Sequence, residues 1–307
     1  MTKIHFAIVL ALLTALISGA NNFLSKLAVT AVADPVVFTF LKNSVAVIFL
    51  LGFILTANRW REVISLTKKQ IIQLLAIGII GGGIAFLLFF TGLSLIPAAH
   101  AAFIHKTLFL WVALLAIPFL REKIGWLQLS ALALLLIGNL GVFGIPRFTG
   151  HTGELMVLSA TLLWAVENII AKKVLSSCSS LLVGSARMLI GSSVILLVLI
   201  AQHKTSLLLT LSPAQWSWTA LTGLLLTGYV VSWYTALKYA PATLVASLLV
   251  PATLVTNLLT AMFITHSFPS LQLLSAAFIA LGIVLIISRA SHLSTHRHPQ
   301  PDYSPHP

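Results

Sequence analysis

The sequence predicts an all-α integral membrane protein of ten transmembrane helices, arranged as two inverted five-helix repeats. Three observations lead to this fold class. Apolar residues make up 59% of the chain and charged residues only 8%, long apolar runs fill almost its whole length, and its two halves resemble each other. So few polar side chains cannot cover a water-soluble globule. A run of about 20 apolar residues is long enough to cross a hydrocarbon core of about 30 Å.

The apolar runs follow one another with short polar connections. They lie at about 5–25, 35–56, 71–92, 97–119, 125–144, 153–174, 181–201, 215–236, 242–264 and 270–288. Each run predicts one membrane-spanning helix. The first run follows Lys3 and looks like a secretory signal, but its match to the sixth run favours a helix that is retained.

The positions of lysine and arginine predict the orientation. With a cytoplasmic N-terminus, 12 of the 18 basic residues lie on the inner side, and only Lys26, Arg147 and Lys204 lie on the outer side. Short cytoplasmic loops are enriched in positive charge. We therefore expect an integral protein of a bacterial inner membrane with both termini in the cytoplasm. The formal charge of +12 is then an insertion signal and does not indicate nucleic-acid binding.

The two halves align with a shift of 144 to 146 residues. A shift of 144 pairs Thr91 with Thr235, Leu93 with Leu237, Pro97 with Pro241, Ala98 with Ala242, Gln128 with Gln272 and Gly138 with Gly282. Shifts of 145 or 146 pair Asn22 with Asn168, Lys26 with Lys172, Lys42 with Arg187, Thr67 with Ser212 and Gln70 with Gln215. The last two pairs predict capping boxes at the start of the third and eighth spans. Eleven matches in order indicate a duplication.

The duplication predicts one five-helix unit over 1–145, a second over 146–290, and a disordered cytoplasmic tail over 291–307. An odd number of spans in each unit makes the second unit enter the membrane from the opposite face. In transporters of that build the substrate binds near the bilayer midplane between the repeats, and rocking of one half alternates access. Gly82, Pro118 and Pro251 are candidate hinges, although such residues also serve close packing or simple kinks.

Basic side chains inside the apolar runs are the main candidates for a binding site, because a charge in hydrocarbon is costly. At about 1.5 Å per residue, Lys42 lies about 10 Å and Lys106 about 13 Å from the outer ends of their spans. Asn21 occupies the position that Glu167 has in the second unit, so no carboxylate is expected beside Lys42. We expect both lysines to bind an anionic group of the substrate, with His105 or His100 as hydrogen-bond donors. Neutral lysines, or lysines that reach the outer interface, are the alternatives.

A second charged group is expected nearer the inner side. Glu167 and Arg187 reach a similar depth in the sixth and seventh spans, which predicts an ion pair. The alternative is that Glu167 carries a coupling proton. Trp164 and Tyr234 are candidates for stacking on an organic substrate. No carboxylate or thiol stands at ligand spacing from the histidines, and no phosphate-binding loop is present, so the sequence predicts no metal, no cofactor and no catalytic residue.

Several of these segments resemble a known family. They are Gly19-Ala-Asn-Asn22…Ser25-Lys26, Trp164-Ala-Val-Glu-Asn168…Lys172 and Phe119-Leu-Arg-Glu122…Trp126-Leu-Gln128…Gly138. Together with the basic residue early in the second and seventh spans, they resemble EamA-type permeases of the drug/metabolite transporter superfamily. The chain departs from that family at Ser18, where tryptophan is usual, at Lys42, where arginine is usual, and at His266, where a glutamate would echo Glu122. Asn22, in the polar first span, joins the expected substrate-binding residues.

The resemblance implies a secondary permease, often an exporter of amino acids or related metabolites. We therefore expect a transporter, not an enzyme, that exports a small organic metabolite such as an amino acid or an organic anion. The expected partners are this substrate and the lipid bilayer, and a homodimer is left open. Two other classes also remain open: a protein of the same fold that translocates lipids or lipid headgroups, and a membrane assembly subunit without transport activity.

Overall fold

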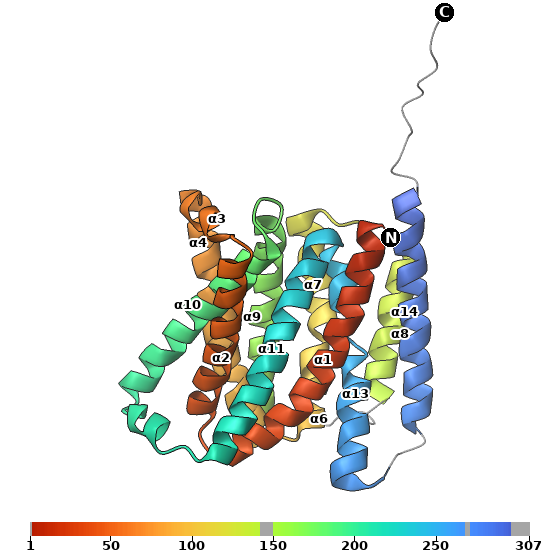
Figure 1. The fold of residues 1–307 in the computed structure, drawn as a ribbon. Coiled ribbons are helices and arrows are strands. Elements are labelled where there is room, and N and C mark those ends of the chain that lie inside the picture. The colour runs from red at the N-terminus through yellow and green to blue at the C-terminus, as the bar shows by residue number, and fades with distance from the viewer. Residues whose placement is uncertain (1, 142–149, 268–270, 296–307) are drawn as a thin grey trace, which may run out of the picture.

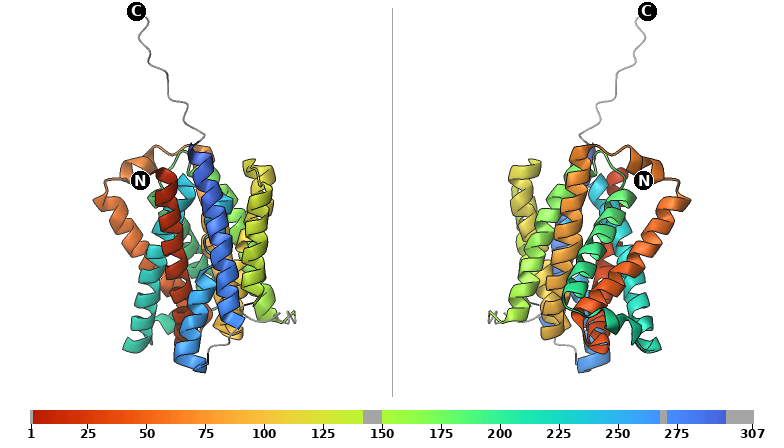
Figure 2. Two further views of the ribbon diagram at one scale, coloured as in Figure 1. Left: turned by 90° about the vertical axis from the view of Figure 1, so that its right-hand side faces the viewer. Right: turned by 90° about the vertical axis from the view of Figure 1, so that its left-hand side faces the viewer.

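The computed structural model describes residues 2–141, 150–267 and 271–295, and within these ranges the chain is helical with no strand (Figures 1 and 2). The helices are α1 (Lys3–Val32), α2 (Pro35–Thr56), α3 (Trp60–Ile64), α4 (Lys68–Ala76), η1 (Ile77–Ile84), α5 (Ala85–Leu95), α6 (Ala98–Lys106), α7 (Leu108–Leu120), α8 (Trp126–Gly141), α9 (Thr152–Val174), α10 (Ser180–Ala201), η2 (Thr205–Leu209), α11 (Pro213–Tyr239), α12 (Ala242–Ser247), α13 (Ala252–Thr260), η3 (Ala261–Thr265) and α14 (Leu271–Thr295).

These helices make ten passes through the bundle. Nine helices or continuous runs of helices in the described residues are long and apolar enough to cross a membrane, and α8 is a shorter apolar helix that supplies the tenth pass. Three passes consist of more than one element: α4 with η1 and α5, α6 with α7, and α12 with α13 and η3. The predicted fold class is therefore confirmed.

Two local expectations differ from the structure. Helix α14 continues through Thr295, past residue 291, where the disordered tail was expected to begin; residues 296–307 lie outside the described residues. Pro118 lies inside α7 and does not interrupt it, because a proline near the end of a helix removes only one backbone bond. The break in this pass falls at Thr107, between α6 and α7. In the ninth pass the break includes Pro251, as expected.

The helix termini show how the two repeats interlock. Thr67 with Gln70, and Ser212 with Gln215, form the predicted capping boxes at the starts of α4 and α11. Each glutamine also reaches the other repeat, since Gln70 Nε2 donates to Ser177 Oγ at 3.0 Å and Gln215 Nε2 donates to the Ala31 carbonyl at 3.0 Å. In the alignment of the two repeats, Gln70 corresponds to Gln215 and Ala31 corresponds to Ser177, so these two bonds are equivalent.

The two bonds lie on opposite faces of the bundle. Helix α1 begins and α14 ends on one face, drawn at the top of Figure 1, which we call the terminus face. The Gln70–Ser177 bond lies on this face, and the Gln215–Ala31 bond lies on the opposite face. Also on the opposite face, Asp34 caps α2 and pairs with Lys204 at 2.6 Å. Burial raises the pKa of Asp34, but the bonds from Lys204 and from two backbone N–H groups outweigh it and leave this pKa below its usual value.

The repeats are interleaved rather than stacked end to end. Helix α1 packs against α11 and α13, α2 packs against α10 and α11, and α9 packs against α5 and α7. The last pass of each repeat meets that of the other in the α8–α14 crossing. There a Cβ on Gly138 would meet Ile279 and the Ser275 carbonyl, and a Cβ on Gly282 would meet the equivalent residues Leu135 and Ala131. This reciprocal contact is what two inverted copies produce.

Glycines also bring η1 close to α10. A Cβ on Gly82 would lie 2.1 Å from the Arg187 carbonyl oxygen, and a Cβ on Gly191 would lie 2.2 Å from the Gly82 carbonyl carbon. The two backbones therefore touch, which is how small residues let membrane helices approach each other. Close packing at Gly82 is thus observed, and its role as a hinge stays a prediction.

We expect Gly191→Ala to lower the free energy of unfolding by about 1–3 kcal/mol, because the new methyl group overpacks this contact. The measurement is the thermal unfolding midpoint in detergent. Gly52→Ala on α2 is the matched control, since nothing lies within 4 Å of its added Cβ. Equal midpoints for the two variants would contradict the close contact.

Candidate functional site

A cavity of about 40 Å³ lies between the repeats, and we call it the central cavity. It is lined by residues of both repeats, from α1, α2, α5, α6, α7, α9, α10 and α11. Its charged lining residues are Lys42, Glu167 and Arg187. A polar space of this size holds about three water molecules, so an organic substrate requires the cavity to widen.

The first repeat contributes a buried lysine with neutral partners. Lys42 on α2 is 0% exposed, and its Nζ donates to Asn21 Oδ1 at 3.0 Å and to Ser25 Oγ at 2.7 Å, both on α1. The same Nζ lies 4.5 Å from the ring centre of Phe90. A buried ammonium group normally has an anionic partner. Here the partners are an amide and a hydroxyl, which solvate a charge on Lys42 without neutralising it.

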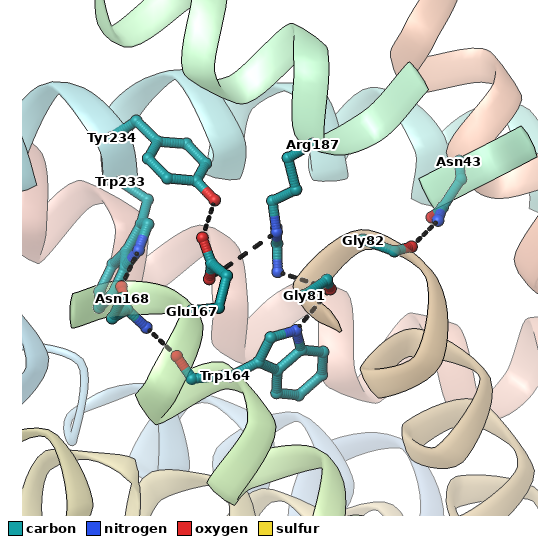
Figure 3. A network of polar contacts seen from close by, with 9 residues as sticks. All are labelled: Asn43, Gly81, Gly82, Trp164, Glu167, Asn168, Arg187, Trp233 and Tyr234. Carbon is teal, nitrogen blue, oxygen red and sulfur yellow. Dashed lines mark hydrogen bonds and ion pairs between the residues drawn. The ribbon is translucent and has the colours of Figure 1, made fainter. Parts of the chain in front are cut away.

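The second repeat builds the same arrangement with a carboxylate (Figure 3). Glu167 on α9 stands at the position of Asn21, and Arg187 on α10 stands at that of Lys42. Glu167 Oε2 lies 3.9 Å from Arg187 Nε, and Glu167 Oε1 accepts a hydrogen bond from the Tyr234 hydroxyl. Arg187 Nη2 donates to the Gly81 carbonyl at 3.2 Å, while its Nε has no hydrogen-bond partner. The expected ion pair is therefore present, and the coupling role of Glu167 stays a prediction.

Two equivalent asparagines are used differently. Asn168 is bonded through both ends of its amide, because its Nδ2 donates to the Trp164 carbonyl at 2.8 Å and its Oδ1 accepts from Trp233 Nε1 at 2.9 Å (Figure 3). Trp164 Nε1 in turn donates to the Gly81 carbonyl at 2.9 Å. Asn22 also lines the central cavity, but its Nδ2 is buried without a partner. Asn168 thus connects two tryptophans of the cavity wall, whereas Asn22 leaves an N–H donor without a partner.

The stretch around Lys106 approaches the central cavity from α6. His105 lines it and lies between two aromatic rings, 5.2 Å from that of Phe89 and 4.8 Å from that of Trp164. Lys106 is 1% exposed and sits behind the wall, where its Nζ donates to Ser18 Oγ at 2.8 Å and lies 3.3 Å from His105 Nδ1. Both lysines are buried inside the bundle, which argues against lysines that reach the outer interface.

The predicted positions of the charged groups were farther apart than their positions in the structure. The prediction placed the two lysines in one layer and Glu167 with Arg187 in another, but Lys42, Glu167 and Arg187 line one cavity. Depth along a helix axis ignores long side chains, which extend several ångströms along it. His100 lies elsewhere, beside Glu154 at 3.5 Å, and Tyr234 stands behind Glu167. Neither of these two is among the lining residues.

One protein family matches both repeats of the sequence. The sequence model of the EamA-like transporter family matches residues 5–144 and again residues 151–288. The chain belongs to the EamA-like transporter family. It is therefore an integral membrane protein and a membrane transporter of the drug/metabolite type.

Other comparisons bear on the fold. A crystal structure of another protein superposes on 96% of this chain and 99% of its own with a TM-score of 0.74, at 16% sequence identity. At that identity the likeness concerns the fold alone. The comparison with curated proteins gives no match.

Some groups at the site of this EamA-like transporter were not foreseen. Asn21 and Ser25, which solvate Lys42, and the Gly81 carbonyl, which accepts from Trp164 and Arg187, were not identified as site residues. The duplication could have indicated Asn21, because Asn21 aligns with Glu167. No signal in the sequence marks the Gly81 carbonyl, because its exposure to side chains depends on the irregular helix η1.

We expect Asn168→Ala to destabilise the transporter by about 1–3 kcal/mol, because it leaves the Trp233 N–H buried without an acceptor. Asn22→Ala is the matched control from the other repeat and should leave the thermal midpoint unchanged, since Asn22 Nδ2 has no partner to lose. Thermal unfolding in detergent compares the two. A larger loss in Asn22→Ala would contradict the division of roles.

Proposed function

We propose that this transporter works by alternating access and exports a small organic metabolite that carries a carboxylate, such as an amino acid or an organic acid. The observation that carries this proposal is Lys42, a fully buried cation in the wall of the central cavity whose hydrogen-bond partners are both neutral. An uncompensated charge in a water-poor interior is unfavourable. A substrate carboxylate beside Lys42 would remove that cost.

The neighbouring groups support the same assignment. Asn22 offers a buried N–H donor without a partner, as a carboxylate oxygen requires. Arg187 is already neutralised by Glu167, which leaves Lys42 as the cation available to an anion at the cavity wall. Lys106 and His105 add positive charge and a ring nitrogen close by. In this arrangement Lys42 and Asn22 bind the substrate directly, and Lys106 acts from behind Ser18.

The rest of the central cavity suits an organic molecule. The rings of Phe86, Phe89 and Trp164 meet at its wall, with centroid distances of 5.4 Å from Phe86 to Trp164 and 5.2 Å from Phe89 to Trp164. Both indole N–H groups, of Trp164 and Trp233, are bonded to the protein, so these side chains present apolar ring surface to a ligand. An amino acid would place its ammonium group toward Glu167, whereas an organic anion would not need that contact.

Orientation and movement complete the proposal. We assign the terminus face to the cytoplasm of a bacterial inner membrane, because basic residues gather in the connections and at the helix ends of that face: Arg59, Arg61, Lys68, Lys69 and Arg121. The central cavity is too small for a metabolite, so rocking of the repeats has to enlarge it on one face at a time. The helix breaks at Thr107 and at Leu248–Pro251 are the places where the helices can bend, with Gly82, Pro118 and Pro251 as proposed hinges.

A thermal-shift screen against amino acids, organic acids and neutral metabolites tests the proposal, because a ligand that binds only the folded form stabilises it. We expect carboxylate-bearing ligands to raise the unfolding midpoint of the purified protein. Lys42→Met should abolish that rise while leaving the ligand-free midpoint unchanged or higher, since a buried uncompensated charge is replaced by a side chain of similar volume.

Lys26→Met is the matched control. Lys26 is a partly buried lysine of the same repeat, but it donates to the carbonyls of Leu93 and Ser94 and does not line the central cavity. Its variant should lose stability and keep the ligand-dependent rise. Full ligand response in Lys42→Met, or a response to neutral metabolites only, would overturn the carboxylate assignment.

A further inference from the structure

One inter-repeat contact on the terminus face involves Glu122, in the connection between α7 and α8. Its Oε1 accepts from the Ala242 backbone N–H at 2.7 Å. Its Oε2 accepts from the Thr243 backbone N–H at 3.2 Å and from the Thr243 hydroxyl at 2.6 Å. Gln128 Nε2 donates to the same hydroxyl at 3.0 Å. Glu122 and Gln128 from the first repeat thus bind the first two residues of α12 in the second repeat, and we call these contacts the Glu122 latch.

The Glu122 latch replaces the usual cap of a helix. Pro241 precedes α12 and provides no side-chain cap, so the free backbone N–H groups at the start of α12 depend on Glu122. A carboxylate at a helix start is favourable for its charge as well as its hydrogen bonds. The first two residues of α12 are therefore hydrogen-bonded to side chains of the first repeat, one just after α7 and one at the start of α8.

Helix α12 is placed to close the terminus face. It packs against α1, α7, α9, α11 and α14. All of these helices except α14 contribute lining residues to the central cavity. Separation of α12 from α7 on this face would therefore loosen the helices that surround the cavity, and the Glu122 latch opposes that separation.

The opposite face lacks two of the residues that would form the equivalent contact. There the end of η3 should bind the start of α6, but His266 stands at the position of Glu122 and Ala99 at that of Thr243. Gln272 keeps the place of Gln128. Within the described ranges, no side chain accepts a hydrogen bond from the backbone N–H of Ala98 or Ala99, and the His266 side chain is exposed.

Two other pairs of polar contacts between the repeats are balanced across the two faces, whereas the approach of His100 on α6 to Glu154 on α9, at 3.5 Å on the opposite face, has no counterpart in the described part of the chain. The Gln70–Ser177 bond on the terminus face has its counterpart in the Gln215–Ala31 bond on the opposite face. On the terminus face Glu62 Oε1 accepts from the backbone N–H of Ser179, the residue that caps α10, and on the opposite face Lys204 binds Asp34, the equivalent cap of α2. These balanced contacts favour neither face. The Glu122 latch has four hydrogen bonds, whereas His100 Nε2 makes no hydrogen bond to the described residues, so the difference between the faces favours closure of the terminus face.

We propose that Glu122 is a positioning residue for transport that holds the terminus face closed, so that the ligand-free transporter rests with its central cavity accessible from the opposite face. The inference rests on the alternating access proposed above. Substrate binding then has to supply the free energy that releases α12. Glu122 acts through this helix and not by touching the substrate.

Cysteine labelling tests this inference without a substrate. Cys178 is the one cysteine of the chain, so Cys178→Ser gives a background for single cysteines. Leu226→Cys then reports on the central cavity, and Ser65→Cys, in the exposed connection between α3 and α4, marks the terminus face. A membrane-impermeant thiol reagent is applied to vesicles of each orientation. Without further changes, we expect Leu226→Cys to react faster from the opposite face.

Glu122→Gln keeps one acceptor oxygen and removes the charge and the second carboxylate oxygen. We expect it to raise the labelling of Leu226→Cys from the terminus face by about tenfold, as loss of one charge-assisted bond implies. Lys123→Gln is the matched control in the same connection and should change nothing, because Lys123 is exposed. The reciprocal variant, His266→Glu with Ala99→Thr, rebuilds the missing contact and should slow labelling from the opposite face.

Unchanged labelling in both Glu122→Gln and the reciprocal variant would overturn the role of Glu122, even if transport itself proceeds. If Glu122→Gln does not fold, the labelling of the reciprocal variant from the opposite face decides whether the contact has this role. If no ligand binds and the cavity never reacts from the terminus face in any variant, the proposed transport function fails, not the Glu122 latch alone.

Discussion

The structure depends on how a lipid-embedded protein solvates a charge that it cannot expose to water. Lys42 and Arg187 occupy equivalent places in two copies of one unit, and both are buried beside the same central cavity. The second copy meets its cation with the carboxylate of Glu167, whereas the first offers only the amide of Asn21 and the hydroxyl of Ser25. Where the second copy has glutamate and forms an ion pair, the first has asparagine and leaves the cation to which we assign the substrate anion.

Close packing makes this solvation possible. Backbone contact between Gly82 and Gly191 brings η1 against α10, and it leaves the neighbouring Gly81 carbonyl within reach of Arg187 and Trp164. A larger residue at either glycine would move the carbonyl away from both donors. The geometry of the charged groups is thus set by small residues that carry no charge themselves.

Much of the fold followed from the sequence, because long apolar runs and a duplicated order of residues are constraints that lipid imposes directly. The ten passes, the inverted repeats and both capping boxes were predicted, and the Glu167–Arg187 pair was predicted from depth alone. Depth did not show that Lys42 shares a cavity with this pair, nor that His100 turns to Glu154. Those facts depend on the rotation of each helix about its axis, on the direction of long side chains, and on a break at Thr107 that no proline or glycine marks.

The crossed glutamine bonds have a mechanical consequence. Gln70 ties the third pass of the first repeat to Ser177, and Gln215 ties the eighth pass to Ala31, so the halves are joined by equivalent side chains at both ends of the bundle. A motion that parts the halves at one end stretches the tie at that end and leaves the tie at the other end in place. In the alternating access proposed above, the intact tie would serve as a fulcrum, and the two would exchange this task in each half of the cycle.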